Sequence, residues 1–245
     1  YTGASPALMG MCAQRNIELT FMSGNGHFLA RVSGEVKGNV TLRKQQYRIS
    51  DNTEQSIKLA RNFITGKVYN CRWVLERAVR DYSLRIDTDS IKKKSKILYQ
   101  SLEKIRTCKT SAQLLGLEGE AAAVYFSVFD ELILQQKEDF TFQGRNRRPP
   151  LDNINAMLSF AYSLLTGMCG SALESVGLDA YVGFFHTDRP GRISLALDIM
   201  EELRSIMADR FVLTIINKRI IKKSHFIQKE SGAVVLTDEG RKLFL

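Results

Sequence analysis

The feature that most constrains this fold is a change of pattern about 45 residues into the chain. From about Gln45 onward, apolar residues recur every three or four positions among basic ones, beginning with EQSIKLARNFITGKVYNCRWVLERAVRDY. This spacing is typical of amphipathic helices. Further helices are predicted in SIKKKSKILYQSLEKIRTC, SAQLLGLEGEAAAVYFSVFDELI and NINAMLSFAYSLLTGMC, the last with Asp152 or Asn153 as its N-cap. Most of the chain is therefore expected to be helical.

The first forty or so residues follow a different pattern. The runs IELTFMS and HFLARVSGEV predict strands, and the Asn25-Gly26 pair between them favours a hairpin turn. The run ASPALMGMCAQR predicts a short helix before the first strand. The sequence thus predicts an α+β protein. Residues 1–44 would form part of an N-terminal β domain that is incomplete here, with a linker to about residue 52, and residues 53–245 a larger, mainly α-helical domain.

The charge balance points to a polyanionic partner. The chain has 35 Lys and Arg residues against 26 Asp and Glu, which gives a net charge of +9. Such an excess favours nucleic acid, because each cation that meets a phosphate releases a condensed counterion. The basic segments LRKQQYR, IKKKSK, GRNRRPP and NKRIIKK are predicted to contact the backbone of duplex DNA, although each alone also fits a solvated face.

Several classes of protein are disfavoured. The four cysteines are widely spaced and form no CxxC pair, which predicts reduced, partly buried thiols in a cytoplasmic protein. No run of eighteen apolar residues and no signal peptide is found, so no membrane span is expected. The GxSxG, Walker and GxGxxG motifs are also absent, which argues against the chemistries they support.

A histidine followed by two acids makes GFFHTDRPGRISLALDIMEELR the strongest candidate for a site. His186 precedes a Pro-Gly turn with Arg189 and Arg192, and the helix that follows carries Asp198 and Glu201. Two carboxylates three residues apart repel each other unless a cation binds them. Imidazole and carboxylates together suit Mg²⁺ or Mn²⁺ acting on a phosphate held by the arginines. The alternative is a loop histidine beside a solvated acidic face.

A third acidic candidate lies in GLEGEAAAVYF. Glu118 is the proposed residue, and Glu120 is its competitor within the same run. The alternative is a glutamate that only favours the start of a helix through the macrodipole.

Together with one further segment, these two stretches resemble the CRISPR-associated adaptation integrases, which are the larger partner of the spacer-acquisition pair. The resemblance is strongest to their type I-C branch. The resemblance rests on GLEGEAAAVYF, RRPPLDNINAMLSFAYSLL and GLDAYVGFFHTDRPGRISLALDIMEELR. The segment SPALMGMCAQRNIELTFMSGNGHFLARVSG is also similar to the end of the family's β domain. The resemblance therefore covers nearly the whole chain.

The resemblance implies a site for Mg²⁺ or Mn²⁺. The family's metal ligands fall on Glu118, His186 and Glu201, while Asp198 and Tyr125 take supporting positions. Glu202 is expected to face solvent. Arg189 and Arg192 remain the candidates for phosphate contact.

The activity implied is that of a metal-dependent DNA endonuclease and integrase whose helical domain is catalytic. The 3′-hydroxyl ends of short foreign DNA would be joined to the CRISPR repeat by transesterification. The implied partners are double-stranded DNA, a second copy in a homodimer and the smaller adaptation protein, all in a prokaryotic cytoplasm. Two alternatives stay open: a DNA-binding scaffold without catalysis, and an adaptor whose basic faces bind acidic proteins.

Overall fold

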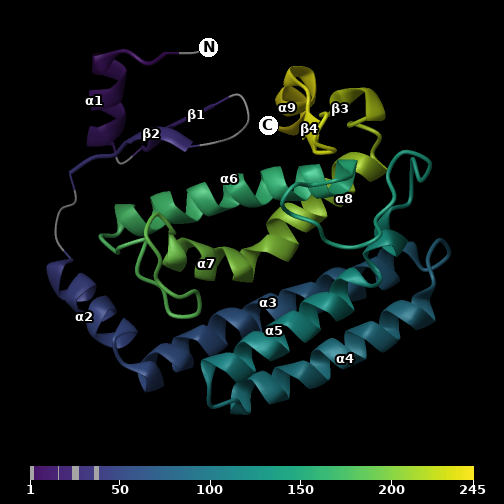
Figure 1. Cartoon of the computed structure of the whole chain (residues 1–245), viewed down its shortest axis with the longest axis horizontal. Helices are drawn as coiled ribbons and strands as arrows, with labels where there is room; N and C mark the ends of the chain where they lie inside the picture. The colour runs from purple at the N-terminus through teal and green to yellow at the C-terminus, as the bar shows by residue number, and fades with distance from the viewer. Residues whose placement is uncertain (1–2, 16, 24–27, 36–38) are drawn as a thin grey trace. The chain divides into compact units, whose positions relative to one another are not determined.

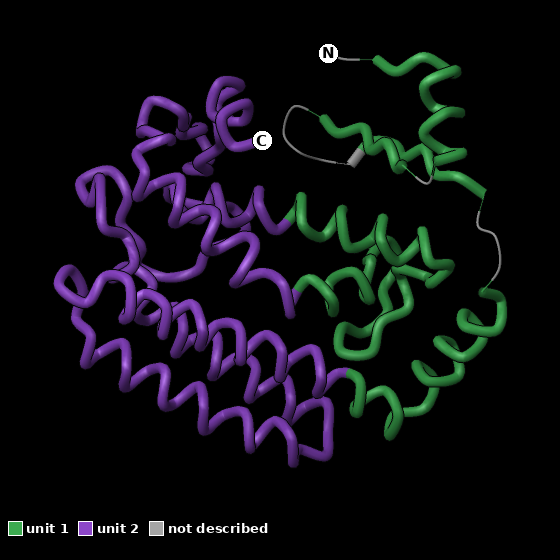
Figure 2. Tube along the Cα trace, turned by 180° about the vertical axis from the view of Figure 1, so that it is seen from behind, with its two compact units in different colours: residues 1–59, 163–200 green, residues 60–162, 201–245 purple. Residues whose placement is uncertain are grey.

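The computed structural model describes residues 3–15, 17–23, 28–35 and 39–245. Figure 2 colours two compact units: unit 1 comprises residues 1–59 and 163–200, and unit 2 comprises residues 60–162 and 201–245. The division falls within three helices, which are α3 (Thr53–Tyr82), α6 (Asn153–Ser175) and α7 (Ser194–Arg204). The units therefore do not coincide with the two sequence segments proposed above as domains.

Unit 1 begins with one helix and a two-stranded antiparallel sheet. Helix α1 (Pro6–Gln14) is capped by Ser5, whose Oγ accepts a hydrogen bond from the Leu8 N–H at 3.2 Å. Strand β1 (Leu19–Met22) pairs with β2 (Phe28–Val32), as Figure 1 shows. These elements confirm the predicted helix and strands. The predicted turn at Asn25-Gly26 lies outside the described residues.

The segment predicted as a linker is helical. Helix α2 (Val40–Ser50) covers most of it, and α3 begins at Thr53. No Gly or Pro occurs between residues 40 and 65, so the segment contains none of the usual helix breakers. A helix here also places two of its side chains on the loop that precedes α7, as described below.

Unit 2 is built on three helices that run side by side in Figures 1 and 2: the larger part of α3, α4 (Thr88–Thr107) and α5 (Ser111–Phe126). Asp87 caps α4 and Thr110 caps α5 through their side-chain oxygens. The fully buried apolar side chains of this unit include Ile64, Leu75, Ile91, Leu98, Ile105, Leu114 and Phe129. The helices predicted from the apolar spacing are thereby confirmed.

Short elements complete unit 2. A 3₁₀ turn spans Phe129–Leu132, and a π-helical turn at Ser205–Asp209 joins α7 to α8. The remaining elements are α8 (Arg210–Asn217), a 3₁₀ turn at Lys223–His225, strands β3 (Phe226–Gln228) and β4 (Val234–Leu236), and α9 (Asp238–Phe244). Strands β3 and β4 pair antiparallel.

Helix α6 settles one prediction and corrects another. Asp152, rather than Asn153, caps it, because its Oδ1 accepts the Asn155 N–H at 2.7 Å. The expectation that no segment could span a membrane rested on the lack of an uninterrupted apolar run, but α6 is long and apolar enough by length and composition alone, with 23 residues and a mean hydropathy of 1.4 over its most apolar 18 residues. Its Asn, Ser and Thr residues hid this from a search for an uninterrupted apolar run. Half of that apolar window is buried within the protein, as in a core helix.

The cysteines are as predicted. Cys12, Cys71, Cys108 and Cys169 are all free and buried. Burial raises the pKa of Cys71 to about 12 and that of Cys169 to about 11, so both thiols are protonated at neutral pH.

Candidate active site

Two predicted ligands, Glu118 and Glu201, meet at one lysine within unit 2. The ammonium of Lys67, on α3, contacts Glu118 Oε1 and lies 2.5 Å from Glu201 Oε2. Lys67 is 3% exposed, so it is buried between the two carboxylates. Glu118 comes from α5 and Glu201 from α7. Three helices thus bring two acids from distant parts of the sequence to one positive charge.

A close approach of α3 to the end of α7 positions Lys67. A Cβ atom on Gly66 would lie 2.4 Å from Glu202 Cγ, so any larger residue here would require the Glu202 side chain to move. Asn70 donates a hydrogen bond from Nδ2 to the Glu202 carbonyl at 2.8 Å. The expectation that Glu202 faces solvent holds only in part, because its side chain lies against α3 at Gly66 and is half-buried.

Arg204 is the second cation that holds Glu201. Its Nη1 donates to both carboxylate oxygens, at 3.0 and 2.9 Å, and its guanidinium lies 4.4 Å from the centroid of the Tyr162 ring. Burial alone would raise the pKa of Glu201. The charges of Arg204 and Lys67, and their hydrogen bonds, outweigh it and lower that pKa to about 2. Glu201 is therefore ionised at neutral pH.

Behind Arg204 lies a buried polar core that includes Tyr125. The Tyr162 hydroxyl donates to Asp209 Oδ1, and Asp209 is presented by the π-helical turn that follows α7. Burial raises the pKa of Asp209 and raises that of Tyr125 well above its usual value. Tyr125 is 1% exposed. Tyr125 therefore belongs to the buried polar core around Asp209.

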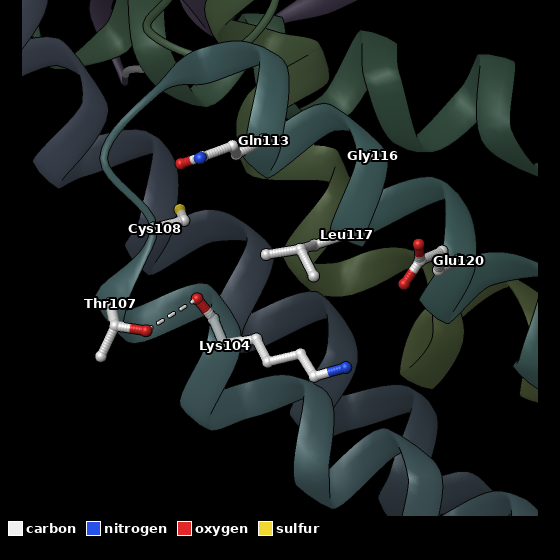
Figure 3. Close-up of a pocket in the computed structure, with 7 residues that line it drawn as sticks. All are labelled: Lys104, Thr107, Cys108, Gln113, Gly116, Leu117 and Glu120. Atoms are coloured by element: carbon white, nitrogen blue, oxygen red, sulfur yellow. Dashed lines mark hydrogen bonds between the residues drawn. The ribbon is translucent and has the colours of Figure 1, made fainter.

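The structure separates Glu118 from its competitor Glu120. Glu120 is exposed and lines a pocket of about 450 Å³ between α4 and α5, together with Lys104, Cys108 and Gln113 (Figure 3). Glu118, on the same helix, is half-buried and contacts Lys67. Only Glu118 shares a cation with Glu201.

The predicted histidine is fixed within unit 1 by Asp198. The Asp198 side chain is fully buried and accepts hydrogen bonds from the backbone N–H groups of Phe184, Phe185 and His186 at 2.7, 3.0 and 2.9 Å. His186 Nδ1 lies 2.7 Å from Asp198 Oδ1. Because a carboxylate accepts, Nδ1 carries the proton, and in the neutral imidazole Nε2 then has a free lone pair. Asp198 thus sets both the place and the tautomer of His186.

The loop that carries His186 is also held by α2 and by one glycine. Gln46, which is buried, donates from Nε2 to the Asp179 and Val182 carbonyls at 2.7 and 2.8 Å and accepts the Asp179 N–H at 2.9 Å. A Cβ on Gly183 would lie 2.8 Å from Ser194 Cβ, so glycine permits the loop to lie against α7. Neither residue carries a recognisable motif, and sequence analysis missed both. The lack of breakers in α2 was the only signal for Gln46.

The predicted phosphate contacts lie on the surface of the same loop. Arg189 is exposed and Arg192 half-buried, in a turn closed by a 3.0 Å hydrogen bond from the Arg192 N–H to the Arg189 carbonyl. Within the described residues neither guanidinium pairs with a carboxylate, which leaves both available for an anion.

Not every basic segment faces solvent. Arg145, from GRNRRPP, donates to Asn155 Oδ1 at 2.6 Å and to Ser159 Oγ at 3.0 Å, so it serves the fold of unit 2. The neighbouring Arg147 and Arg148 are exposed. The prediction of a DNA-contacting surface in this segment therefore rests on Arg147 and Arg148 alone.

The donor chemistry fits a divalent metal, although the side chains are arranged around a lysine. Over the described ranges, no three His, Cys, Asp or Glu side chains form a group that could hold a metal. Two glutamates nevertheless converge on one cation, and the histidine donates Nδ1–H to a buried carboxylate, which leaves Nε2 free in the neutral imidazole. The latter arrangement is common for histidines that bind metals. Carboxylate oxygen and imidazole nitrogen suit Mg²⁺ or Mn²⁺.

Comparison with known proteins gives consistent matches over the whole chain. Residues 1–245 match the family described as CRISPR associated protein Cas1. The CRISPR-associated endonuclease Cas1 1 of Chlorobaculum tepidum is 46% identical over 241 residues, covering 98% of this chain and 70% of that protein. The CRISPR-associated endonuclease Cas1 2 of Rhodospirillum rubrum is 48% identical over 248 residues, covering 100% of this chain and 71% of that protein.

A solved structure of a casposase bound to an integration product has the same fold. It matches with a TM-score of 0.81 and 28% identity, covering 98% of this chain and 65% of that one. The protein therefore spans about 70% of the length of its two named relatives and about two thirds of the casposase chain.

Proposed function

Because the chain belongs to the CRISPR-associated Cas1 family, we propose that it is a metal-dependent DNA endonuclease and integrase. It joins the 3′-hydroxyl ends of short foreign DNA to a CRISPR repeat by transesterification. The relatives are named endonucleases, and the casposase neighbour is bound to an integration product, which supports DNA as the substrate. The observation that carries the proposal is the convergence of Glu118 and Glu201, from separate helices, on one buried cation.

The proposed metal ligands are Glu118, Glu201 and His186, the last through Nε2. Helix α7 supports this grouping, because Asp198, which holds His186, and Glu201 are three residues apart and thus about one turn from each other. A bound Mg²⁺ or Mn²⁺ would polarise the phosphodiester and offset the charge that develops as the 3′-hydroxyl attacks.

The surrounding residues keep the ligands in the right state. Asp198 holds the proton on His186 Nδ1, so that Nε2 is the nitrogen free to bind. Arg204 keeps Glu201 ionised and oriented. Arg189 and Arg192 contact the DNA phosphates from the loop. A contact or a surface charge described above supports each of these roles.

The proposal extends to partners and location. The net charge of +9 supports binding of duplex DNA, both the foreign fragment and the repeat. Family membership supports a homodimer, the smaller adaptation protein as partner, and action in the prokaryotic cytoplasm. Assignment to the type I-C branch rests on the sequence resemblance.

Half-site integration tests the proposal. A labelled duplex with free 3′-hydroxyl ends is incubated with a plasmid carrying a leader and repeat, in Mg²⁺ or Mn²⁺, with and without the smaller protein. We expect joining by the wild type and none by His186→Ala, with DNA affinity in both nearly equal. Joining at the wild-type rate by His186→Ala would show that the histidine is not a ligand.

The alternative of a scaffold without catalysis is disfavoured. A scaffold has no need of ionised, buried carboxylates, which are costly to desolvate. It would bind DNA in the same assay without joining it, in either metal.

A further inference from the structure

Lys67 is a buried charge to which the proposed reaction assigns no role. It lies on α3, is 3% exposed, and contacts both Glu118 and Glu201. A lysine in such a place is unusual, because moving an ammonium out of water is costly unless anions compensate it. Both compensating anions here are proposed metal ligands.

The two carboxylates depend on Lys67 to different degrees. Glu201 has a second cation in Arg204, which donates two hydrogen bonds to it. For Glu118, Lys67 is the one ion-pair partner among the residues that the structure describes. Removing the lysine would therefore leave Glu118 without a counter-charge and would remove what draws it towards Glu201.

A metal ion and this ammonium would compete for the same oxygens. Lys67 reaches one oxygen of each glutamate, so its charge lies where the two carboxylates converge. Two cations held at that point would repel each other strongly in a buried setting. The lysine stem is flexible, with four carbons, and allows the head group to leave while the backbone stays packed at Gly66.

We propose that Lys67 is an internal counterion that holds Glu118 and Glu201 together before metal binds, and that a divalent cation binds by displacing it. This inference rests on the proposed function, because it takes both glutamates as ligands. Lys67 is thus a positioning residue that keeps the two acids paired in the metal-free protein. It also sets the affinity for metal below what the same carboxylates would reach alone.

The test is a calorimetric titration of the full-length protein with MnCl₂, combined with melting curves with and without Mn²⁺. Lys67→Met removes the charge and keeps most of the side-chain volume. We expect it to lower the melting temperature of the metal-free protein and to tighten Mn²⁺ binding at least about tenfold, since like-charge repulsion is relieved. The rise in melting temperature on adding Mn²⁺ should exceed that of the wild type.

Lys58→Met is the matched control. Lys58 lies on the same helix and pairs with Glu54, but its side chain is 57% exposed. Its loss should change neither Mn²⁺ affinity nor the stabilisation by Mn²⁺. Weaker or equal Mn²⁺ binding by Lys67→Met would overturn the inference.

If Lys67→Met does not fold without metal, Lys67→Gln is titrated in its place. Folding of either variant only in Mn²⁺ supports displacement, whereas failure of both to fold even in excess Mn²⁺ contradicts it, because the metal should then supply the missing charge.

The result also separates this inference from the proposed function. Mn²⁺ binding by the wild type that Glu118→Gln leaves intact would show that the ligands are wrong. Loss of binding in Glu118→Gln together with unchanged affinity in Lys67→Met would overturn only the role of Lys67.

Discussion

The proposed metal ligands fall into two halves, the carboxylates of unit 2 and the histidine of unit 1, and each half is held by a different kind of interaction. In unit 2, Glu118 and Glu201 are placed by helices and fixed by the cations Lys67 and Arg204. In unit 1, His186 lies on a loop and is fixed by Asp198, which accepts three backbone N–H groups and the imidazole Nδ1–H. The first half depends on opposite charges, and the second on satisfied hydrogen bonds.

The difference matters for how each half responds to change. Ion pairs between buried groups lose most of their stabilisation when one partner is removed or neutralised. A loop held by many hydrogen bonds loses order in steps, since each bond contributes about 0.5–1.5 kcal/mol, or somewhat more to a charged group. We therefore expect abrupt effects in the carboxylate half and graded effects in the histidine half.

The largest effect should come from neutralising Glu118. Glu118→Gln keeps the shape of the side chain but removes its charge, and strand transfer in Mn²⁺ should fall by about 10³-fold or more, as when a main source of charge stabilisation is lost. Half-site integration measures the change. Glu120→Gln, on the exposed pocket side of the same helix, should retain wild-type activity. Equal losses in both variants would contradict the distinction between the two glutamates.

In the metal-free protein, acid should lower the free energy of unfolding by protonating Glu201. Its pKa is lowered from 4.5 to about 2 in the folded protein, so its contribution is present above pH 4.5 and is lost as the pH falls towards 2. That contribution is on the order of 3 kcal/mol at neutral pH.

Chemical denaturation in EDTA from pH 6 to 2 measures this contribution as the stability gap between wild type and Glu201→Gln. The gap should be widest at pH 6 and should close by pH 2. The exposed Glu103→Gln should give a small gap throughout. A gap for Glu201→Gln that does not change with pH would rule out the lowered pKa.

In the histidine half, the largest graded effect is expected from Asp198→Asn. The amide cannot accept all four hydrogen bonds as a carboxylate does, and it no longer favours the proton on His186 Nδ1. Activity should fall by about 10–100-fold, which is typical when the partner of a metal-binding histidine is changed. Kinetics at several Mn²⁺ concentrations should show weaker apparent metal affinity. Unchanged metal dependence would mean that Asp198 serves the fold alone.

The smallest effect is expected from Gln46→Ala, which removes three hydrogen bonds between α2 and the histidine loop. The free energy of unfolding should fall by about 1–3 kcal/mol, because buried backbone groups are left without partners. Urea denaturation measures it, and Gln45→Ala, at the exposed neighbouring position, should be almost neutral. Similar losses in the two variants would contradict the role of Gln46.

Much of the fold could be predicted from sequence because apolar spacing in α3, α4, α5 and α6 is a local signal. The helix in the predicted linker was missed because the contacts that hold it are not local. Arg43 and Gln46 donate hydrogen bonds to carbonyls more than 130 residues away in the sequence. The same applies to the site. The motifs indicated Glu118, His186 and Glu201, but Lys67 has no motif of its own and becomes meaningful only when three helices meet.

The position of Glu202 shows another limit. It was expected to face solvent, yet Gly66 on α3 lets the helices approach closely enough to leave it half-buried. A single glycine within a helix gives no warning of this in the sequence. Tyr125 is similar, because a family position says nothing about whether a side chain lies on the surface or in the core.

The central claim is that one divalent metal is bound by carboxylates from the first half and an imidazole from the second. Electron spin echo envelope modulation of the Mn²⁺-loaded protein tests it most directly, because it detects nitrogen bound to manganese. We predict one Mn²⁺ per chain with nitrogen modulation in the wild type, no modulation in His186→Ala, and no bound Mn²⁺ in Glu118→Gln. Bound Mn²⁺ without nitrogen modulation, or modulation that persists in His186→Ala, would contradict the account.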